Sequence, residues 1–382
     1  NYFFEIEEED EDGGLRQYGV SKEHRPNPIV QMGLFMDADG MPLAFRCFPG
    51  NSNEQISMKP LEQTILDDFG HSRFVTCTDA GLSSKANKLF NTQGERAYIT
   101  AVSVKKLEGY IRTWALEKTG WHLPGELGEF DLDACEEHEY ARFYNSTFYK
   151  ERLIKGKDGF EEKLIVTFSF KYREYLANIR ERQTARAEET IKKGPGAVTR
   201  KNQNDPKRFI ETRAVTAEGE IAERLVSGLD TKRIAAEAIC DGFYAVATSL
   251  IDEEDISEIL KVNAGRWEIE ECFRIMKTEF KARPVYLSRD ERIEAHFLTC
   301  FIALLIYRIL EQRLGNEYTC ENIVDTLRGF DFLEVKGEGY IPLYMRTDLT
   351  DELHETAGFR TDFEIVTYDR MRRILEGSRK RI

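Results

Sequence analysis

Two carboxylates stand in positions that favour chemistry. Asp79 follows an apolar, strand-like run (residues 73–78, RFVTCT) and precedes a turn that contains glycine, and Glu270 lies within residues 262–280 (VNAGRWEIEECFRIMKTEF). Ligands bind at the carboxyl ends of strands in sheets that helices cover, so Asp79 is a candidate ligand as well as a candidate cap for the next turn. Carboxylates from different elements hold the divalent ions of two-metal sites for phosphoryl transfer, and Mg²⁺ suits their hard oxygens.

The segment around Glu270 is predicted to be one helix. Four apolar residues recur at the spacing of one helical face: Ile269, Phe273, Met276 and Phe280. Arg266 lies one turn before Glu270, and Lys277 lies about two turns after it. From this helix alone, two interpretations stay open. It is either an exposed helix with ordinary ion pairs, which stabilise little, or a metal-binding carboxylate between cations that bind phosphate.

Composition limits the class of protein. A length of 382 residues allows about two domains, and 41% hydrophobic with 32% charged residues predicts a globular protein with a sizeable core. The longest apolar run, residues 297–306, is about half the length that crosses a bilayer, so no membrane is expected as a partner. The seven cysteines are scattered without a CxxC pair, which favours free thiols in a reducing cytoplasm.

The charge is unevenly distributed. A net charge of −14 argues against contact with nucleic acid over the whole surface. Residues 171–213, however, hold twelve Lys or Arg against six Asp or Glu, which predicts a local basic patch for a polyanion. Four cations of this segment are candidates for contact with nucleic acid: Lys192, Lys193, Arg200 and Lys201. The alternative is a loop that is merely solvated.

The elements around the two carboxylates predict a mixed α/β fold. Strands are expected at residues 2–6, 29–36, 42–48, 73–78 and 96–104, with a tight turn at 37–40 that makes a hairpin of the second and third. Helices are expected at residues 57–69 and, with Ser83 or Ser84 as the cap, up to about residue 90. This order places helices on a mixed sheet.

The pattern changes between residues 105 and 240. Strand-like runs at 164–170 and 209–215 alternate there with polar loops and one charged helix at 171–193, so we interpret this region as a subdomain inserted into the core. The core resumes with a strand at 241–249 and an apolar helix at 294–313, whose His296 is either a packed core histidine or a functional one. A last amphipathic helix is expected at 368–379. The sequence lacks a Gly-rich phosphate loop, a GxSxG elbow and an HExxH motif.

At this point the sequence resembles the DDE transposases of bacterial insertion sequences. Residues 263–277 fit their Y-(2)-R-(3)-E-(6)-K signature through Arg266, Glu270 and Lys277, although Asn263 stands at the tyrosine position. Three further segments look like the same family: residues 79–81 (DAG), the hairpin at 33–51, and residues 283–285 (RPV). The resemblance covers nearly all of the chain.

The resemblance implies a ribonuclease H-like core, made of residues 1–104 and 241–313. A largely β subdomain at 105–240 would be inserted between the second catalytic Asp and the catalytic Glu, and a helical tail at 314–382 would follow. Asp79 would be the second catalytic acid and Glu270 the third, and together they would hold Mg²⁺ or Mn²⁺, as two ions. The first acid of the family would precede Asn1, so this fragment is expected to lack it.

The resemblance also implies an activity and its partners. A water would cleave the phosphodiester at a transposon end, and the freed 3′-OH would attack target DNA, while Arg266 and Lys277 contact phosphates. Double-stranded DNA, with terminal inverted repeats and a target, would be the substrate of a homodimer in the bacterial cytoplasm, at the nucleoid. Two other interpretations stay open: a ribonuclease H-like nuclease that cuts without joining, and a DNA-binding relative that is catalytically incomplete.

Overall fold

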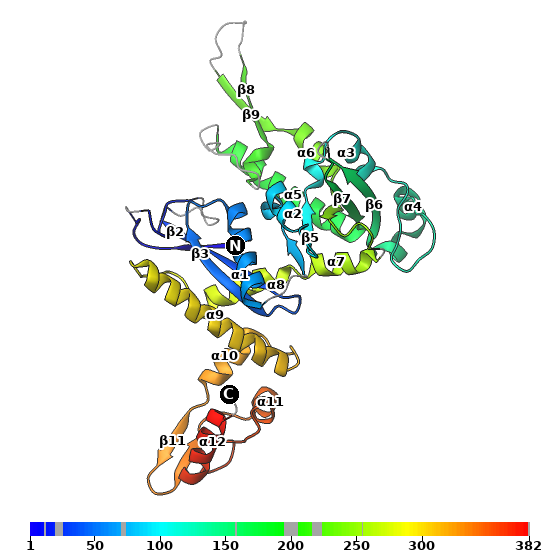
Figure 1. Ribbon diagram of the computed structural model, residues 1–382. Coiled ribbons are helices and arrows are strands. Elements are labelled where there is room, and N and C mark those ends of the chain that lie inside the picture. The colour runs from blue at the N-terminus through cyan, green and yellow to red at the C-terminus, as the bar shows by residue number, and fades with distance from the viewer. Residues whose placement is uncertain are drawn as a thin grey trace. The chain divides into compact units, whose positions relative to one another are not determined.

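The computed structural model describes residues 1–10, 13–19, 26–69, 74–156, 159–194, 205–215, 224–253 and 255–380. The chain divides into two units. Unit 1 is made of Asn1–His71 and Gly265–Ile382, and unit 2 is made of Ser72–Ala264 (Figure 1). Each unit has its own sheet and its own core, and each is described by itself.

The sheet of unit 1 has three antiparallel strands in the order β1-β2-β3. They are β1 (Tyr2–Glu5), β2 (Ile29–Met36) and β3 (Pro42–Pro49). The predicted hairpin is confirmed, since β2 pairs with β3 from Val30 opposite Pro49 to Met36 opposite Pro42. The turn closes because an oxygen of the Asp37 side chain accepts hydrogen bonds from the Asp39 and Met41 amides.

Helices cover the two faces of this sheet, because successive side chains point to opposite faces and six consecutive residues of β2 are buried. On one face, α1 (Glu54–Phe69) packs Leu61 and Ile65 against Ala44 of β3. On the other face, α8 (Trp267–Thr278) and α9 (Asp290–Arg313) complete the main core of the unit. The ring of Phe4 lies 4.7 Å from that of Phe297, which fixes β1 against α9.

The C-terminal segment belongs to unit 1 as well. It comprises α10 (Cys320–Arg328), the hairpin of β11 (Phe332–Val335) and β12 (Gly339–Pro342), α11 (Asp348–Ala357) and α12 (Tyr368–Lys380). Leu349 and Leu353 of α11 are buried in the main core of the unit, so this segment is packed rather than appended. The amphipathic helix expected at 368–379 is therefore confirmed as α12.

The sheet of unit 2 has five strands in the order β4-β5-β10-β7-β6. They are β4 (Val75–Thr78), β5 (Ala97–Val102), β6 (Phe148–Lys155), β7 (Glu161–Phe168) and β10 (Phe243–Thr248). β4 and β5 are parallel and the other pairs are antiparallel, so the predicted mixed α/β fold is confirmed. The side chains of Ile99, Ile165 and Val246 are buried on one face of this sheet.

Helices and a second hairpin complete unit 2. The helices are α2 (Lys85–Phe90), α3 (Gly109–Leu116), α4 (Leu132–Phe143), α5 (Phe170–Lys192), α6 (Thr231–Ala238) and α7 (Ile256–Ala264). The hairpin pairs β8 (Ile210–Val215) with β9 (Arg224–Leu229). As predicted, Ser84 caps α2, since its hydroxyl accepts from the Asn87 amide. The division at residues 104 and 240 stays a prediction, and β6 and β7 of that region share one sheet with β4 and β5.

The prediction of one helix over residues 262–280 is wrong. α7 ends at Ala264 and α8 begins at Trp267, with a turn between them. Gly265 lies at the break. Glycine is unfavourable inside a helix, because a residue without a Cβ loses more conformational freedom there than any other. The two units also meet along the chain at this point, so the break separates Asn263 from the rest of the signature stretch.

Candidate active site

Asp79 lies at the carboxyl end of β4, as predicted. It is exposed, and one oxygen of its carboxylate accepts a hydrogen bond of 2.9 Å from the Gly81 amide, which caps the 3₁₀ turn Ala80–Leu82. The second oxygen has no hydrogen bond from any residue that the structure describes. The Asp79 carbonyl accepts from the Thr100 hydroxyl on the neighbouring strand. Asp79 is therefore both a cap and a held carboxylate with one open oxygen.

Glu270 lies in the first turns of α8 and is exposed. Its neighbours on the helix are occupied: Glu268 is paired with Arg308, and Glu271 with Arg274. Within the described ranges, the Glu270 carboxylate has no hydrogen bond or ion pair. The structure thus separates one open carboxylate from two that are paired with arginines.

The buried side of α8 fixes the direction in which Glu270 points. Phe273 and Met276 are buried in the main core of unit 1, and Ile269 and Phe280 pack against it, so the predicted apolar stripe is confirmed. The Arg308 guanidinium of α9 contacts the Glu268 carboxylate at 2.9 Å, the Cys272 sulfur at 3.2 Å and the Glu311 carboxylate at 2.7 Å. These contacts tie α8 to α9.

Sequence reasoning missed Arg308. The side chain of Arg308 is only 8% exposed, although it lies in a long helix that contains an extended apolar stretch. A lone cation inside such a helix is a usable signal, because a buried charge requires a partner. The turn of the β2–β3 hairpin also approaches this cluster. A Cβ on Gly40, whose φ is +77°, would lie 3.0 Å from a Glu268 oxygen, so glycine is favoured there.

The two candidate acids belong to different units: Asp79 to unit 2 and Glu270 to unit 1. Each is presented from a rigid element of its own unit, the end of a buried strand in one case and a core helix in the other. Each offers carboxylate oxygens of the kind that Mg²⁺ and Mn²⁺ accept.

The predicted cations fall into three groups. On unit 1, Arg266 is half-buried, and the Lys277 ammonium lies 4.1 Å from the centre of the Tyr2 ring. On unit 2, Lys192 and Lys193 are exposed at the carboxyl end of α5. Arg200 and Lys201 lie outside the described residues.

Part of the positive charge predicted for residues 171–213 is used inside unit 2, where three of its twelve cations form ion pairs. Arg173 forms two hydrogen bonds with Glu136, Arg180 pairs with Asp241, and Arg208 pairs with Glu237. The guanidinium of Arg173 lowers the pKa of Glu136, and hydrogen bonds from Arg208 and Lys105 help to lower that of Glu237 against the opposing effect of burial. These pairs hold α5 on its unit. Any polyanion site on this segment therefore has fewer cations than the composition indicates.

His296 is a packed histidine. It is half-buried, its Nε2 lies 3.0 Å from the Ala282 carbonyl oxygen, and its ring meets that of Phe297 edge-on. The seven cysteines are all free thiols, as predicted.

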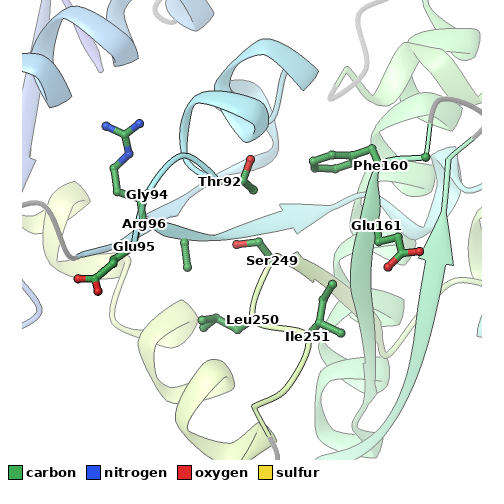
Figure 2. Close-up of a pocket in the computed structure, with 11 residues that line it drawn as sticks. Thr92, Gly94, Glu95, Arg96, Phe160, Glu161, Ser249, Leu250 and Ile251 are labelled. Atoms are coloured by element: carbon green, nitrogen blue, oxygen red, sulfur yellow. The ribbon is translucent and has the colours of Figure 1, made fainter.

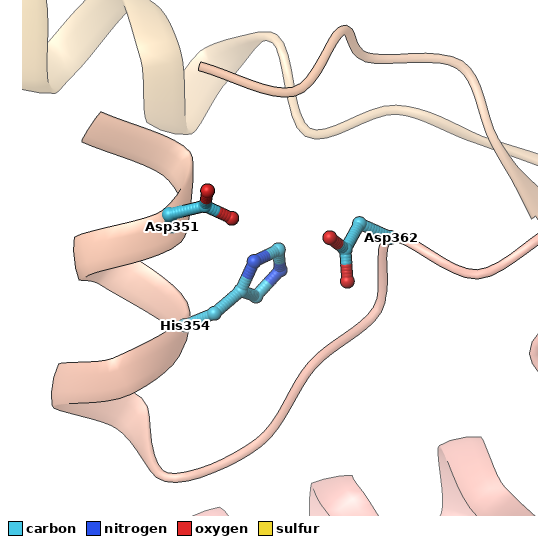
Figure 3. A group of neighbouring side chains, drawn as sticks. All are labelled: Asp351, His354 and Asp362. Atoms are coloured by element: carbon cyan, nitrogen blue, oxygen red, sulfur yellow. The ribbon is translucent and has the colours of Figure 1, made fainter. Parts of the chain in front are cut away.

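A cluster in the C-terminal segment could in principle hold a metal ion. Ligand atoms of Asp351, His354 and Asp362 lie within 4.8 Å of one another (Figure 3). Both carboxylates are already bound by arginine: Arg360 contacts the two of them, and Arg346 bonds to both oxygens of Asp351.

This cluster therefore fits an ion-pair network better than a metal site. A hydrogen bond from Arg360 lowers the pKa of Asp362 to about 2, and burial lowers that of His354. The Thr361 amide donates to Nε2 of His354, which keeps that nitrogen as an acceptor. A cation would have to displace two guanidinium groups, so we assign the cluster a structural role.

A hollow with a volume of about 470 Å³ lies on unit 2 (Figure 2). It is lined by the loop at 92–97, by Phe160 and Glu161, and by residues 249–251. Because β4 runs parallel to β5, which starts at Ala97, this hollow lies at the opposite end of these strands from Asp79. It also lacks a cluster of acids, so it is not the candidate site.

The chain matches a known protein family. The model of the transposase DDE domain family matches residues 9–306, which are 298 of the 382 residues. The match includes Asp79 and Glu270 and ends inside α9. No curated protein matches the chain. The mixed α/β fold agrees with a ribonuclease H-like domain of this family.

Proposed function

This chain belongs to the transposase DDE domain family, and we propose that it cleaves DNA at transposon ends and joins the freed 3′-OH to target DNA. Each step is a phosphoryl transfer at one phosphodiester. In the first, a water oxygen bonds to phosphorus, the bond to the 3′-oxygen breaks, and that oxygen leaves as a hydroxyl. In the second, the 3′-oxygen attacks a target phosphodiester in the same way. A divalent metal supplies a more acidic nucleophile and stabilises the leaving oxygen.

The proposed ligands of that metal are Asp79 and Glu270, with Mg²⁺ or Mn²⁺ bound as two ions. One observation carries this assignment for Glu270. It is the open carboxylate on α8, while Glu268 and Glu271 on either side are neutralised by arginines. Because no described residue binds this carboxylate, its oxygens are open to an ion, which favours a role in binding. Asp79 meets the same condition with its second oxygen.

The proposed DNA contacts use cations near Glu270 and a second group farther along the chain. Arg266 and Lys277 lie four residues before and seven residues after Glu270, so both can reach phosphates beside a bond held at that carboxylate. Lys192 and Lys193 extend the contact from the exposed end of α5, and Arg200 and Lys201 follow in the sequence. These contacts recognise the charge of the DNA phosphates rather than the base sequence.

The proposed partners are the terminal inverted repeats of a transposon and a duplex target. Two ends have to be brought together, so we propose a homodimer on DNA. The proposed location is the bacterial cytoplasm, at the nucleoid.

Substitution of Glu270 tests the function. We expect Glu270→Gln to abolish Mg²⁺-dependent cleavage of a duplex that carries a transposon end, and to leave binding of that duplex intact. Glu271→Gln is the matched control, because it changes the adjacent carboxylate, which is bound to Arg274. Cleavage and joining are followed on labelled DNA.

Three results would redirect the assignment. Undiminished cleavage by Glu270→Gln would refute the role of this carboxylate. Cleavage by the unaltered protein without any joined product would favour a nuclease. Binding without cleavage in either Mg²⁺ or Mn²⁺ would favour a DNA-binding relative that is catalytically incomplete.

A further inference from the structure

Helix α9 is apolar on two opposite faces. One face lies in the core of unit 1, through five residues that include Phe297 and Leu304. The opposite face carries an exposed stripe at helical spacing: Ala295, Leu298, Ile302, Ile306 and Ile309. Their exposed fractions reach 61% at Ile306. A helix that is apolar all round is normally covered all round, so the stripe requires an occupant.

A bilayer fits this face poorly. By length and composition alone, α9 could cross a membrane. Its other face, however, is packed against β1 and α8, and Arg308 in its last third is held in a buried network with Glu268 and Glu311. A spanning helix would have to leave that core.

We propose that the stripe pairs with the same stripe of a second copy of this chain, with the two helices antiparallel and a two-fold axis at Ile302. Residues equally distant from position 302 then face each other. Leu298 meets Ile306, Ala295 meets Ile309, and Ile302 meets itself. A surface that pairs with itself in this way is what a two-fold dimer needs.

The charges at the two ends of α9 support this pairing. Glu291 lies eleven residues before Ile302 and Arg313 eleven residues after it, on the same side of the helix as the stripe. Both side chains are exposed, and neither is ion-paired within the part of the chain that the structure describes. In the antiparallel pair, each Glu291 faces the partner's Arg313. A parallel pair would set like charges side by side.

The exposed apolar area of the stripe is small, which indicates a weak dimer. Four side chains that are 39–61% exposed present on the order of 400 Å² of apolar surface per copy, near the size of functional patches. A contact between two copies removes about 800 Å² from water, which is below the standard size of a stable interface. We therefore expect a dissociation constant in the micromolar range and a tighter dimer on DNA that carries two ends. The effect of DNA rests on the proposed function, whereas the pairing in solution does not.

The first test places a charge on the axis. In Ile302→Glu, two carboxylates would face each other, so we expect dimerisation in sedimentation experiments to weaken at least about a hundredfold. Met345→Glu is the matched control, since Met345 is an exposed apolar residue of unit 1 outside the stripe. Circular dichroism and melting temperature verify that both variants fold.

The second test reverses the end charges. We expect Glu291→Arg or Arg313→Glu alone to weaken the dimer about three- to tenfold. The double variant should return to within about twofold of the original constant. The double variant carries both substitutions at the helix ends. Restored pairing would therefore show that the single variants dimerise weakly because of the charges, and not because their fold is altered. In addition, Ile302→Cys should form a covalent dimer on oxidation, and Met345→Cys should not.

Three outcomes would overturn the proposal. The unaltered chain could be monomeric up to about 100 µM with and without DNA, Ile302→Glu could dimerise as strongly as the control, or the double reversal could fail to restore pairing. Flotation of the protein with lipid vesicles that depends on Ile302 would replace the second copy with a bilayer. Loss of cleavage in Glu270→Gln is a separate readout, so the two proposals can fail independently.

Discussion

Replacement of Arg308 is expected to loosen the helix that carries Glu270. In Arg308→Met, the volume of the side chain is largely kept, but Glu268 and Glu311 lose the cation that lies 2.9 and 2.7 Å from them. At an effective dielectric constant of about 20, unit charges at these separations attract each other by about 6 kcal/mol per pair. Desolvation of the ions offsets much of this attraction, and breaking a buried network costs about 3–5 kcal/mol.

The partial exposure of the two carboxylates shifts the expected loss of free energy toward the lower end of that range, or slightly below it. The side chains of Glu268 and Glu311 are 24% and 16% exposed, so water partly solvates them once the guanidinium is gone. We therefore expect the free energy required to open α8 and α9 to fall by about 2–4 kcal/mol. Arg274→Met is the matched control. Its pair with Glu271 is an exposed pair within one helix turn, and its removal should cost about 0–1 kcal/mol.

Hydrogen exchange measured by mass spectrometry is the appropriate assay, because it reports the opening of each element separately in a chain of two units. Amides of α8 and α9 should exchange about a hundredfold faster in Arg308→Met, while those of β7 and β10 in unit 2 should be unchanged. Adding Glu268→Gln and Glu311→Gln to this variant should recover at least half of the loss, since the uncompensated charges are removed. Equal exchange in Arg308→Met and Arg274→Met would refute the reasoning.

Two further predictions concern charge. The pKa of Asp362 is lowered from 3.8 to about 2 in the folded protein, so its pair with Arg360 stabilises fully above about pH 4 and is lost as the pH falls toward 2; the difference in melting temperature between the unaltered protein and Asp362→Asn should accordingly shrink between pH 5 and 2, and a difference that stays constant would contradict this. If Lys192 and Lys193 contact phosphates, replacing both by Met should reduce the slope of log K against log salt concentration by about 1–2, whereas Lys336→Met, an exposed cation on unit 1, should leave the slope unchanged.

Sequence reasoning worked best where one short-range rule decides the structure. The β2–β3 hairpin follows from two apolar runs around Asp37 and Gly40, and the start of α2 follows from the Ser84 cap. The apolar stripe of α8 could be predicted because Ile269, Phe273, Met276 and Phe280 recur at the helical period.

The sequence pattern failed where long-range contacts or weak patterns decide. α4 was not predicted, since half of its residues are polar or charged and Glu139 interrupts its helical geometry. The break at Gly265 was read as continuous helix, because apolar residues continue on both sides of it. The network around Arg308 joins residues up to 40 positions apart, which no local period reveals. For the candidate site, the residue types and their spacing were readable, whereas the reason that Glu270 differs from Glu268 and Glu271 came only from the partners of those two.

The order of the units along the chain has a consequence for synthesis. Unit 2 lies entirely between the two segments of unit 1, so the ribosome completes it before Gly265 is made. Domains generally fold as they emerge. The three-stranded sheet of unit 1 must therefore wait, with Phe4 and Met32 on a face that α8 and α9 will later cover. A chain interrupted before residue 265 would release a finished unit 2 attached to an uncovered apolar sheet, and such a product is a natural substrate for chaperones and proteases.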